Sequence, residues 1–333
     1  MKICLMGGSL SDRLDEGMQN ITHHLGRELS RRHEVRTVAV RPAALVRCGR
    51  SLGAFRPDVI HYTSGPSILS LALLRLAAAA SPHSKTVVSA LHPWFPLHSD
   101  LWIPLFRPDM VLVQSRAMEK FFQRHGCRTA FLSNGVDAAR FQPAARGVKS
   151  AARAAFGLPA DKFIILHVGA VKSGRGVGVC RSLQGGDQQV LVVGSVSTGY
   201  EPPLRKDLES RGCIVWKQYI PDIEKVYGAA DCYIFPAQDP LHAIETPLSV
   251  LEAMAANLPV ITTRFGAIAD TFAEGDGLIF ADSAGEFAQG VRRVREGTLT
   301  IRNRDKVLEL SWENIAARLE KIYADVAGGG SST

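Results

Sequence analysis

The chain has 333 residues, of which 46% are hydrophobic and 21% are charged. This composition excludes an intrinsically disordered protein, and the length fits two domains of ordinary size. The net charge of +7 is uneven, because residues 1–157 carry 21 Lys and Arg against 10 Asp and Glu. No RNA- or DNA-binding motif accompanies this basic half, so an anionic membrane surface or a lipid-phosphate acceptor fits it better than nucleic acid. An ordinary soluble basic surface remains the alternative.

Cysteine usage and apolar segments bear on the compartment. The six cysteines form no C-x-x-C pair and several lie in apolar runs, which favours reduced, buried thiols in a cytoplasmic protein. The start of the chain has only a short apolar run between Lys2 and Gly7, unlike a signal peptide. The most apolar segment, residues 68–80, contains Arg75 and is shorter than the roughly 20 residues of a membrane span. We expect a cytoplasmic protein that is at most associated with a membrane surface.

The first half alternates strands and helices. Residues 2–6 predict a strand, Gly7 and Gly8 follow it, and residues 15–32 predict a helix. The two glycines either let a ligand approach the backbone or form a tight turn. Further strands are predicted at residues 35–40, 57–62, 85–91, 110–114 and 129–132. This order indicates a parallel sheet with helices on both faces, where ligands bind beyond the carboxyl ends of the strands. His61 and His92 lie at such ends.

The second half begins a new series near residue 157. A strand at 163–168 runs into a glycine-rich loop that contains Gly169, Lys172 and Arg175. The loop is not a P-loop, because no Lys-Ser/Thr follows its second glycine. Its cations suit the charge of a departing diphosphate, and a solvated turn is the alternative. Later strands are predicted at residues 190–194, 213–216, 230–236, 259–262 and 277–280, and a last amphipathic helix at 312–324.

A helix with two carboxylates follows the strand at 230–236. We expect it to start with Thr246 as its cap and Pro247 in the first helical position. Glu245 then lies just outside the helix, and Glu252 lies about two turns inside it.

The start of such a helix offers unpaired N–H groups, here near Leu248 and Ser249, which favour an anion such as a diphosphate. Carboxylates suit the hydroxyls of a sugar and a ribose. Together these features indicate a sugar-nucleotide site, and a solvated helix face is the alternative.

The stretch from His242 to Asn257 resembles the acidic motif E-x-F-G-L-x-x-L-E-A-M-A of retaining GT-B glycosyltransferases, the family-four type also called glycosyl transferases group 1. Glu252 and the Ala-Met-Ala that follows it match this motif. Six residues separate Glu245 from Glu252 where the family has seven. Either a deletion has moved Glu245, or Ile244 occupies the first acidic position.

Other segments carry the same resemblance. Residues 134–137 (Asn-Gly-Val-Asp) resemble the family's N-G-V-D segment, and residues 220–231 resemble its V-P…Y-x-x-A-D helix. The loop 169–176 is similar to its V-G-R-x…K-G loop, with Ala170 in the first basic place and Arg175 in the second. Lys172 is a candidate to compensate for Ala170.

The resemblance implies an α/β protein of the GT-B fold, with two Rossmann-like domains facing each other across a cleft and a C-terminal helix crossing back to the first. The expected parts are an acceptor-side domain, a donor domain, the returning helix and a flexible tail, at residues 1–157, 158–312, 313–327 and 328–333.

The resemblance also implies a function. A sugar of the hexosyl or N-acetylhexosaminyl class would move from a nucleoside-diphosphate donor, such as a UDP-sugar, to a hydroxyl of a sugar or lipid-linked acceptor in polysaccharide or glycoconjugate biosynthesis, with retention of configuration. The expected donor- and nucleotide-binding residues are Gly7, Gly8, Gly169, Lys172, Arg175, Leu248, Ser249 and Glu252, and the expected catalytic residues are His92, Glu245 and Arg175. The sequence has no D-x-D pair, so we expect neither a metal nor another cofactor.

Two alternative functions remain open at the level of the sequence. A sugar-nucleotide 2-epimerase on the same fold would consume the donor without an acceptor. A binding or scaffold protein would follow from decay of the site, which Ala170 and the shortened acidic motif favour. The basic residues among apolar ones in the first half, which motivate membrane contact, are Arg41, Arg47, Arg50 and Arg56.

Overall fold

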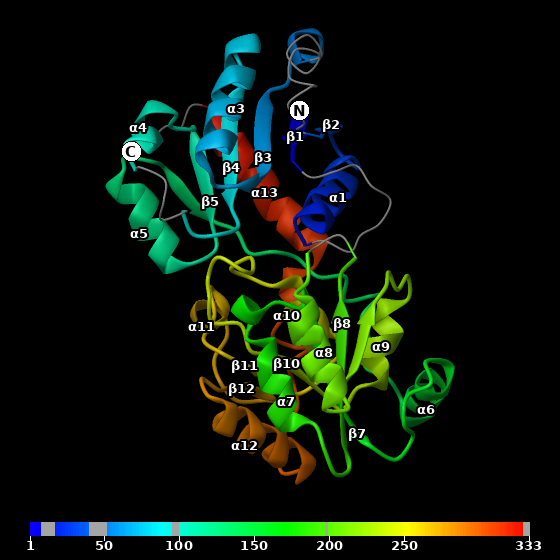
Figure 1. The fold of residues 1–333 in the computed structure, drawn as a ribbon. Coiled ribbons are helices and arrows are strands. Elements are labelled where there is room, and N and C mark those ends of the chain that lie inside the picture. The colour runs from blue at the N-terminus through cyan, green and yellow to red at the C-terminus, as the bar shows by residue number, and fades with distance from the viewer. Residues whose placement is uncertain (8–16, 40–51, 95–99, 197–198, 329–333) are drawn as a thin grey trace. The chain divides into compact units, whose positions relative to one another are not determined.

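A computed structural model describes residues 1–7, 17–39, 52–94, 100–196 and 199–328 of the chain (Figure 1). The chain forms two compact units. The first contains residues 1–135 and 312–333, and the second contains residues 136–311. The chain therefore leaves the first unit after its last strand and returns to it with its final helix.

The first unit is built on a parallel sheet whose six strands run in the order β2-β1-β3-β4-β5-β6. They are β1 (Lys2–Met6), β2 (Glu34–Val38), β3 (Val59–Gly65), β4 (Lys85–Ala90), β5 (Met110–Val113) and β6 (Thr129–Phe131). The helices are α1 (Gly17–Leu29), α3 (Ile68–Ala80), α4 (Trp102–Leu105), α5 (Arg116–Arg124) and α13 (Trp312–Ala327). The order of strands reverses between β1 and β3, which makes their carboxyl ends a switch point of this sheet.

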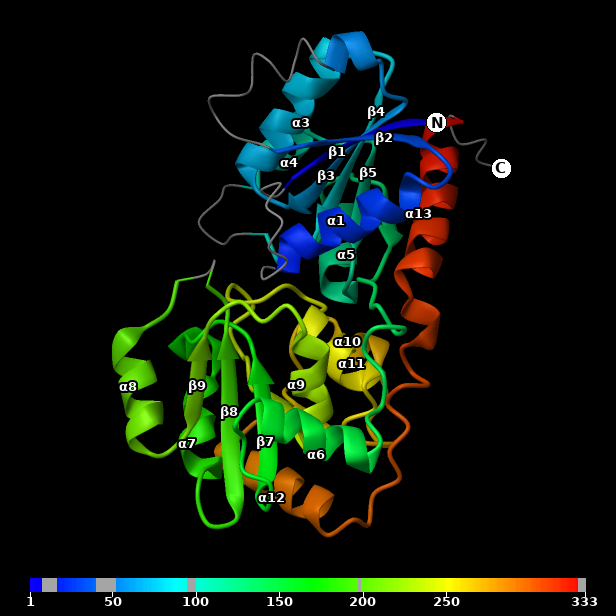
Figure 2. The same ribbon diagram turned by 90° about the vertical axis from the view of Figure 1, so that its right-hand side faces the viewer.

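Helices cover both faces of the first sheet, because successive side chains of a strand point to opposite faces (Figure 2). Val111 and Val113 of β5 share one core with Ile103 of α4 and Phe122 of α5. Leu112 points the other way and lies among side chains of α1 and α13. Both faces of each central strand are therefore apolar, as expected for a parallel sheet.

The returning helix α13 is fixed to the first sheet by a buried histidine. His61 of β3 is fully buried, and its Nδ1 lies 2.6 Å from the hydroxyl of Tyr323 in α13. Its Nε2 lies 2.8 Å from the hydroxyl of Ser89 in β4. Burial lowers the pKa of His61 to about 3, so the ring is neutral at neutral pH. These contacts give His61 a packing role between the first sheet and α13.

The second unit repeats the architecture with the strand order β12-β11-β10-β7-β8-β9. Its strands are β7 (Phe163–Val168), β8 (Gln188–Gly194), β9 (Ile214–Lys217), β10 (Cys232–Phe235), β11 (Val260–Thr262) and β12 (Leu278–Phe280). If β7 is counted as the first strand and the sheet is read from β9 to β12, the order is 3-2-1-4-5-6, which is that of a Rossmann fold. The switch point lies between β7 and β10, so a ligand is expected beyond the carboxyl ends of these two strands.

The helices of the second unit are α6 (Arg146–Ala155), α7 (Cys180–Leu183), α8 (Pro202–Ser210), α9 (Ile223–Ala229), α10 (Leu248–Ala255), α11 (Ile268–Thr271) and α12 (Ala284–Arg295), with short 3₁₀ turns η2 (Ser173–Arg175), η3 (Val177–Val179) and η4 (Leu308–Leu310). Residues of α7, α8 and α12 share one core with the sheet. Helices α6, α9 and α10 form a second packed set, in which α9 contacts both α6 and α10. Both sets are visible around the sheet in Figure 2.

Among the described residues, no helix is long and apolar enough to cross a membrane. The five described cysteines, Cys4, Cys127, Cys180, Cys213 and Cys232, are buried, as the sequence indicated.

Candidate functional site

Most of the expected donor-side residues lie in the second unit, in the two loops that follow β7 and β10. Gly169, Lys172 and Arg175 belong to the first of these loops, and Glu245 ends the second, just before α10. Both loops leave the carboxyl ends of the strands that flank the switch point. The sheet order thus places the glycine-rich loop beside the acidic motif, although about 70 residues separate them in the sequence.

Arg175 is a half-buried cation in the first loop. Its Nε donates to the carbonyl of His242 over 2.6 Å, which joins the two loops. Burial lowers the pKa of the guanidinium, although arginine stays charged at neutral pH. Among the described residues no carboxylate forms an ion pair with Arg175 or Lys172, and the nearby Glu201 binds the N–H and hydroxyl of Ser173 instead. A buried charge without a counter-charge is costly, so this position favours an anionic ligand.

Two glycines allow the loops to pack this closely. A Cβ on Gly174 would lie 2.5 Å from Nδ1 of His242, whose ring is also held by Asp239 at 2.8 Å. Gly176 has a φ of +67°, and a Cβ there would lie 2.1 Å from the carbonyl oxygen of Pro236. The glycines of this loop therefore serve the contact with the loop after β10.

Helix α10 begins one residue later than the sequence predicted. It runs from Leu248, Pro247 occupies the capping position with ψ of 128°, and no side chain caps the helix. The N–H groups of Val250 and Leu251 both donate to the Pro247 carbonyl, at 3.2 and 3.4 Å. The prediction of Thr246 as cap is wrong, because Pro247 has an extended conformation and itself takes the capping position. The N–H groups of Leu248 and Ser249 still open the helix, where no intrahelical acceptor is available.

Tyr233 connects the start of α10 to the end of β7. Its hydroxyl lies 2.8 Å from Oγ of Ser249 and 3.3 Å from the carbonyl oxygen of Val168. Burial raises the pKa of Tyr233, so the phenol keeps its proton and can donate it to either oxygen. This side chain fixes the helix start against the strand that carries Gly169.

Glu252 faces a buried tyrosine from the preceding helix. Tyr227 of α9 donates its hydroxyl proton to Oε2 of Glu252 over 2.7 Å and also lies 3.3 Å from the carbonyl oxygen of Ser249. Burial raises the pKa of Glu252, and the Tyr227 hydroxyl acts in the opposite direction. The tyrosine itself is fully buried, against Phe141 and Tyr233. Glu252 is therefore a carboxylate held in one orientation by its neighbour.

His167, in the strand before the glycine-rich loop, is a further polar group of this region. It is fully buried, its Nδ1 donates to the carbonyl of Ile234 over 3.0 Å, and its Nε2 has no hydrogen-bond partner in the described residues. Burial lowers its pKa to about 4, so Nε2 carries a lone pair at neutral pH. A Cβ on Gly169 would lie 3.0 Å from Nη1 of Arg175 and 3.2 Å from this Nε2. Both side chains thus approach the same point above Gly169.

Glu245 is only 4% exposed. Its carbonyl accepts the N–H of Ala267 over 2.9 Å, and a Cβ on Gly266 would lie 2.4 Å from the same carbonyl oxygen. The Gly266–Ala267 turn therefore packs directly on the backbone of Glu245. Neighbouring Ile244 is half-buried, and the choice between the two for the family's first acidic position stays open.

Gly7 and His92 belong to the first unit, and Gly8 lies outside the described residues. Gly7 ends β1, and a Cβ on it would lie 2.2 Å from Oγ1 of Thr63 and 2.9 Å from Oγ of Ser64. The side chains of Thr63 and Ser64, at the end of β3, thus occupy the space beside Gly7 through which a ligand would reach its backbone. His92 follows β4 and is half-buried. Their expected contacts with the donor stay predictions.

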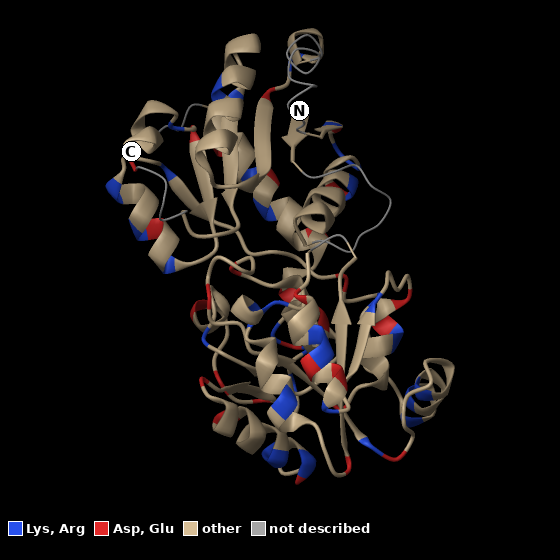
Figure 3. Cartoon of the chain, in the orientation of Figure 1, with Lys and Arg blue, Asp and Glu red and all other residues tan. Residues whose placement is uncertain are grey.

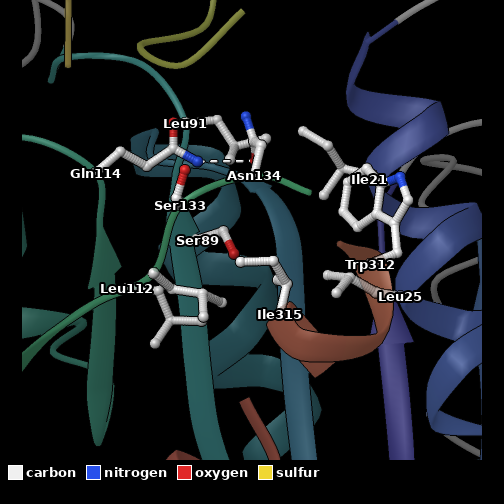
Figure 4. Close-up of a pocket in the computed structure, with 11 residues that line it drawn as sticks. Ile21, Leu25, Ser89, Leu91, Leu112, Gln114, Ser133, Asn134, Trp312 and Ile315 are labelled. Carbon is white, nitrogen blue, oxygen red and sulfur yellow. Dashed lines mark hydrogen bonds between the residues drawn. The ribbon is translucent and has the colours of Figure 1, made fainter. Parts of the chain in front are cut away.

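A small, mostly apolar pocket lies beyond β4, β5 and β6 in the first unit (Figure 4). Ser89 and Leu112 line its sheet side, and Trp312 and Ile315 of α13 line it from the other side. At its mouth the amide of Gln114 donates to Asn134 over 2.8 Å. Leu91, which immediately precedes His92, also lines it. The pocket is too narrow for a sugar ring, and its polar end is closed by the protein's own hydrogen bond.

Three residues of the second-unit site, Tyr227, Tyr233 and His167, were not assigned a role from the sequence. Tyr227 was recognised only as part of a family-like helix. Each acts through a partner 16 to 67 residues away in the chain. The signal available was chemical: tyrosines and a histidine within buried segments need hydrogen-bond partners.

The match to a known protein family lies within the second unit. Residues 178–296 match the family model of glycosyl transferases group 1. The sulfoquinovosyl transferase SQD2 of Arabidopsis thaliana is 25% identical over 240 residues, which cover 67% of this chain and 46% of the relative. A D-inositol 3-phosphate glycosyltransferase of Corynebacterium urealyticum is 27% identical over 247 residues, which cover 65% of this chain and 56% of the relative. The chain thus spans about half the length of these curated relatives.

Among solved structures, Anabaena Alr3699/HepE in complex with UDP superposes with a TM-score of 0.78 at 15% sequence identity, over 98% of this chain and 100% of that chain. At this identity the likeness concerns the fold. Together with the family match, it confirms the expected GT-B architecture of two Rossmann-like units and the resemblance to glycosyl transferases group 1.

Proposed function

We propose that this chain, whose residues 178–296 match the family model of glycosyl transferases group 1, moves a sugar from a nucleoside-diphosphate donor to an acceptor hydroxyl with retention of anomeric configuration. The observation that carries the proposal is Arg175, a half-buried cation without a carboxylate partner in the described residues, whose loop is joined by a hydrogen bond to the loop that leads into α10. An anion at this place completes the electrostatics of the site.

The diphosphate is the part of the donor that this region suits best. Arg175 supplies a full positive charge, and Lys172, half-buried in the same loop, supplies a second. The N–H groups of Leu248 and Ser249 add the positive end of the α10 dipole. These groups stabilise the charge that develops on the diphosphate as the bond to the sugar breaks.

The ribose is assigned to Glu252. A carboxylate accepts hydrogen bonds from two vicinal hydroxyls, and Tyr227 holds one of its oxygens in place. The structures of HepE contain UDP and UDP-glucose, which makes UDP-sugars the first donors to test. His92 and Glu245 are assigned to the transferred sugar on the resemblance of their segments.

The proposed chemistry needs no protein nucleophile. The acceptor hydroxyl attacks the anomeric carbon from the face that the diphosphate leaves, so that the new C–O bond replaces the old one with the same configuration. The hydroxyl proton passes to an oxygen of the departing diphosphate. We propose that this reaction needs no metal and that the protein works in the cytoplasm on a sugar or lipid-linked acceptor at a membrane surface.

The test is incubation of the full chain with a panel of UDP-, GDP- and ADP-sugars, with and without candidate acceptors, followed by NMR of the products. The proposal predicts acceptor-dependent release of one nucleoside diphosphate, a product with the donor's anomeric configuration, and the same rate in excess EDTA. Inversion at the anomeric carbon contradicts the retaining mechanism, and loss of activity in EDTA contradicts metal independence.

The same incubation separates the alternatives. A 2-epimerase converts or hydrolyses the donor equally well without acceptor. A decayed binding protein binds a nucleoside diphosphate but gives no product with any donor. Binding of none of the nucleotides argues against all three functions.

A further inference from the structure

Three large apolar side chains are exposed within five residues of the first unit. Leu101, Trp102 and Leu105 are 84%, 40% and 62% exposed. Single exposed apolar residues are common on soluble proteins, but such a group including a tryptophan marks an interaction surface. These residues lie at the start of α4 and along it, outside the pocket and the donor-side loops.

The exposure is a fixed property of this part of the fold. Ile103, between the exposed residues, is fully buried in one core with Leu71 and Leu74 of α3. Trp102 stacks on Phe106, with ring centroids 5.6 Å apart and planes 6° from parallel. The helix is thus anchored by one side and presents its other side outward.

The neighbouring helix α3 extends the apolar character. Leu69 and Leu76 are 64% and 63% exposed. The two leucines are seven positions apart, about two helical turns, which places them on the same face of the helix. Helix α3 contacts α4, and both lie on the same side of the first sheet (Figure 1).

Basic side chains flank this apolar group. Arg107 follows α4 and donates to the carbonyl of Gly126, just after α5. At the other end of α4, Asp100 lies 3.6 Å from Nε2 of His125, which ends α5. The exposed Arg124 therefore immediately precedes the residue that contacts Asp100, and the exposed Lys120 lies one helical turn earlier in α5. Figure 3 shows the basic residues along α5.

The charge of the chain agrees with this placement. The first unit carries 19 Lys and Arg against 12 Asp and Glu, whereas the second carries 20 of each, so the whole net charge of +7 belongs to the first unit. Acidic residues near α4 are Asp100, which faces His125, Glu119 in the first turn of α5, and Asp109, whose carboxylate lies 3.9 Å from Nζ of Lys85.

We propose that Leu101, Trp102 and Leu105, with the flanking Arg107, Lys120 and Arg124, form a docking surface for an anionic phospholipid bilayer, which we call the α4 surface. Tryptophan and leucine enter the interface between headgroups and acyl chains, and Lys and Arg bind the anionic headgroups. This surface is distinct from the segment of Arg41, Arg47 and Arg50, which lies outside the described residues. It does not depend on the proposed sugar transfer.

Charge favours a bilayer over a second copy of the chain. A two-fold contact through the α4 surface would bring the same Arg and Lys side chains of two copies together, which repels them. An anionic bilayer supplies the opposite charge together with an apolar layer. Both parts of the α4 surface are then satisfied by one partner.

The test uses the full chain and vesicles of phosphatidylcholine with or without phosphatidylglycerol. Co-sedimentation is expected with the anionic vesicles only and is expected to weaken as salt rises. The triple variant Leu101→Ser, Trp102→Ser and Leu105→Ser should lose at least about tenfold in partition coefficient. Lys120→Gln and Arg124→Gln should each cost about fivefold.

Tryptophan emission reports on the α4 surface directly. Trp102 is the most exposed of the four tryptophans, since Trp94 and Trp312 are 6% and 4% exposed and Trp216 is half-buried. Binding to anionic vesicles should shift the emission to shorter wavelength. Trp102→Phe should abolish this shift while leaving most of the binding.

Matched changes on the second unit provide the control. Val148→Ser removes an equally exposed apolar side chain, and Arg292→Gln with Arg293→Gln removes two cations of α12. These variants should bind like the wild type. The proposal is overturned if the triple variant binds unchanged, if binding leaves Trp102 emission unaltered, or if light scattering shows self-association that the triple variant loses.

Discussion

At the scale of single residues, the pair of Tyr227 and Glu252 combines burial with a hydrogen bond that holds a carboxylate in place. Their hydrogen bond is 2.7 Å long, and burial raises the pKa of the carboxyl. The tyrosine hydroxyl is a strong donor only toward the ionised form, so the pair works best when Glu252 is charged. This makes nucleotide affinity sensitive both to the hydroxyl and to pH.

Removing the Tyr227 hydroxyl should weaken nucleotide binding without unfolding the protein. Tyr227→Phe keeps the ring against Phe141 but removes the hydrogen bond that orients Glu252. The binding free energy should weaken by about 1 to 2 kcal/mol, so Kd for the nucleoside diphosphate should rise about tenfold. Glu252→Ala should raise this Kd further and should also raise the KM for the donor. Titration calorimetry measures the two Kd values, and initial rates measure KM. An unchanged KM in Glu252→Ala contradicts the ribose assignment.

The same pair predicts a pH dependence. Because the pKa of Glu252 is raised, lowering the pH protonates it earlier than an ordinary glutamate, and nucleotide affinity should fall there. Above this pKa the affinity should be constant. Glu252→Gln should bind more weakly and show a flat profile over this range. Titrations between pH 4 and 8 test this, and a wild-type profile as flat as that of Glu252→Gln contradicts it.

His167 is expected to position Arg175. Its unpartnered Nε2 and Nη1 of Arg175 approach the same point above Gly169. His167→Leu should raise the nucleotide Kd about tenfold, whereas His167→Gln, which keeps an acceptor, should stay within about threefold. In a protein that already contains Arg175→Lys, adding His167→Leu should raise the nucleotide Kd only slightly further. Equal losses in both backgrounds indicate a role in packing alone.

At the scale of elements, the docking of α13 depends on a neutral histidine. His61 joins α13 to β4 through Tyr323 and Ser89. Burial lowers its pKa to about 3, below the ordinary 6.5. The unfolded chain therefore binds more protons between pH 6.5 and 3, and the stability that His61 contributes is complete above pH 6.5 and is lost as the pH falls toward 3.

Acid should therefore destabilise the first unit before most carboxylates titrate. Between pH 8 and pH 5, His61 should account for a loss of about 2 kcal/mol in the free energy of unfolding. Urea unfolding of the wild type and of His61→Gln at both pH values measures it. The variant should be less stable at pH 8 and lose about 2 kcal/mol less on acidification. The same loss in both proteins contradicts the assignment to His61.

The elements that the sequence defined best are those with strong local patterns. Strand β7 was predicted at its observed bounds, because an apolar run there is followed by glycine. The start of α10 was misplaced, since Thr246 and Pro247 together suggest a capped helix, and only the conformation of Pro247 shifts the start to Leu248.

Contacts across elements were beyond reach of the sequence alone. Whether Arg175 is solvated or buried depends on the His242 carbonyl, and the partner of Glu252 lies on another helix. No local pattern encodes either contact. The resemblance supplied Glu252 itself, but the residues that orient it became visible only in the fold.

At the scale of the whole molecule, the two units differ in charge and in expected task. The second unit has no net charge, so the proposed diphosphate site relies on the local charge of the half-buried Arg175. The first unit carries the net positive charge and the α4 surface. This division suits an enzyme that holds a soluble donor on one unit and works near an anionic surface with the other.

The central claim is that the second unit binds a nucleoside diphosphate through Arg175. Thermal unfolding of the full chain with UDP, GDP and ADP tests it most directly. The account predicts that at least one nucleotide, at about 100 times its Kd, raises Tm by about 5 °C or more. Arg175→Gln should abolish the shift, and Arg181→Gln, at the exposed pair with Asp207, should leave it intact. A wild-type chain that none of the three nucleotides stabilises, or an Arg175→Gln variant stabilised as strongly, would contradict the account.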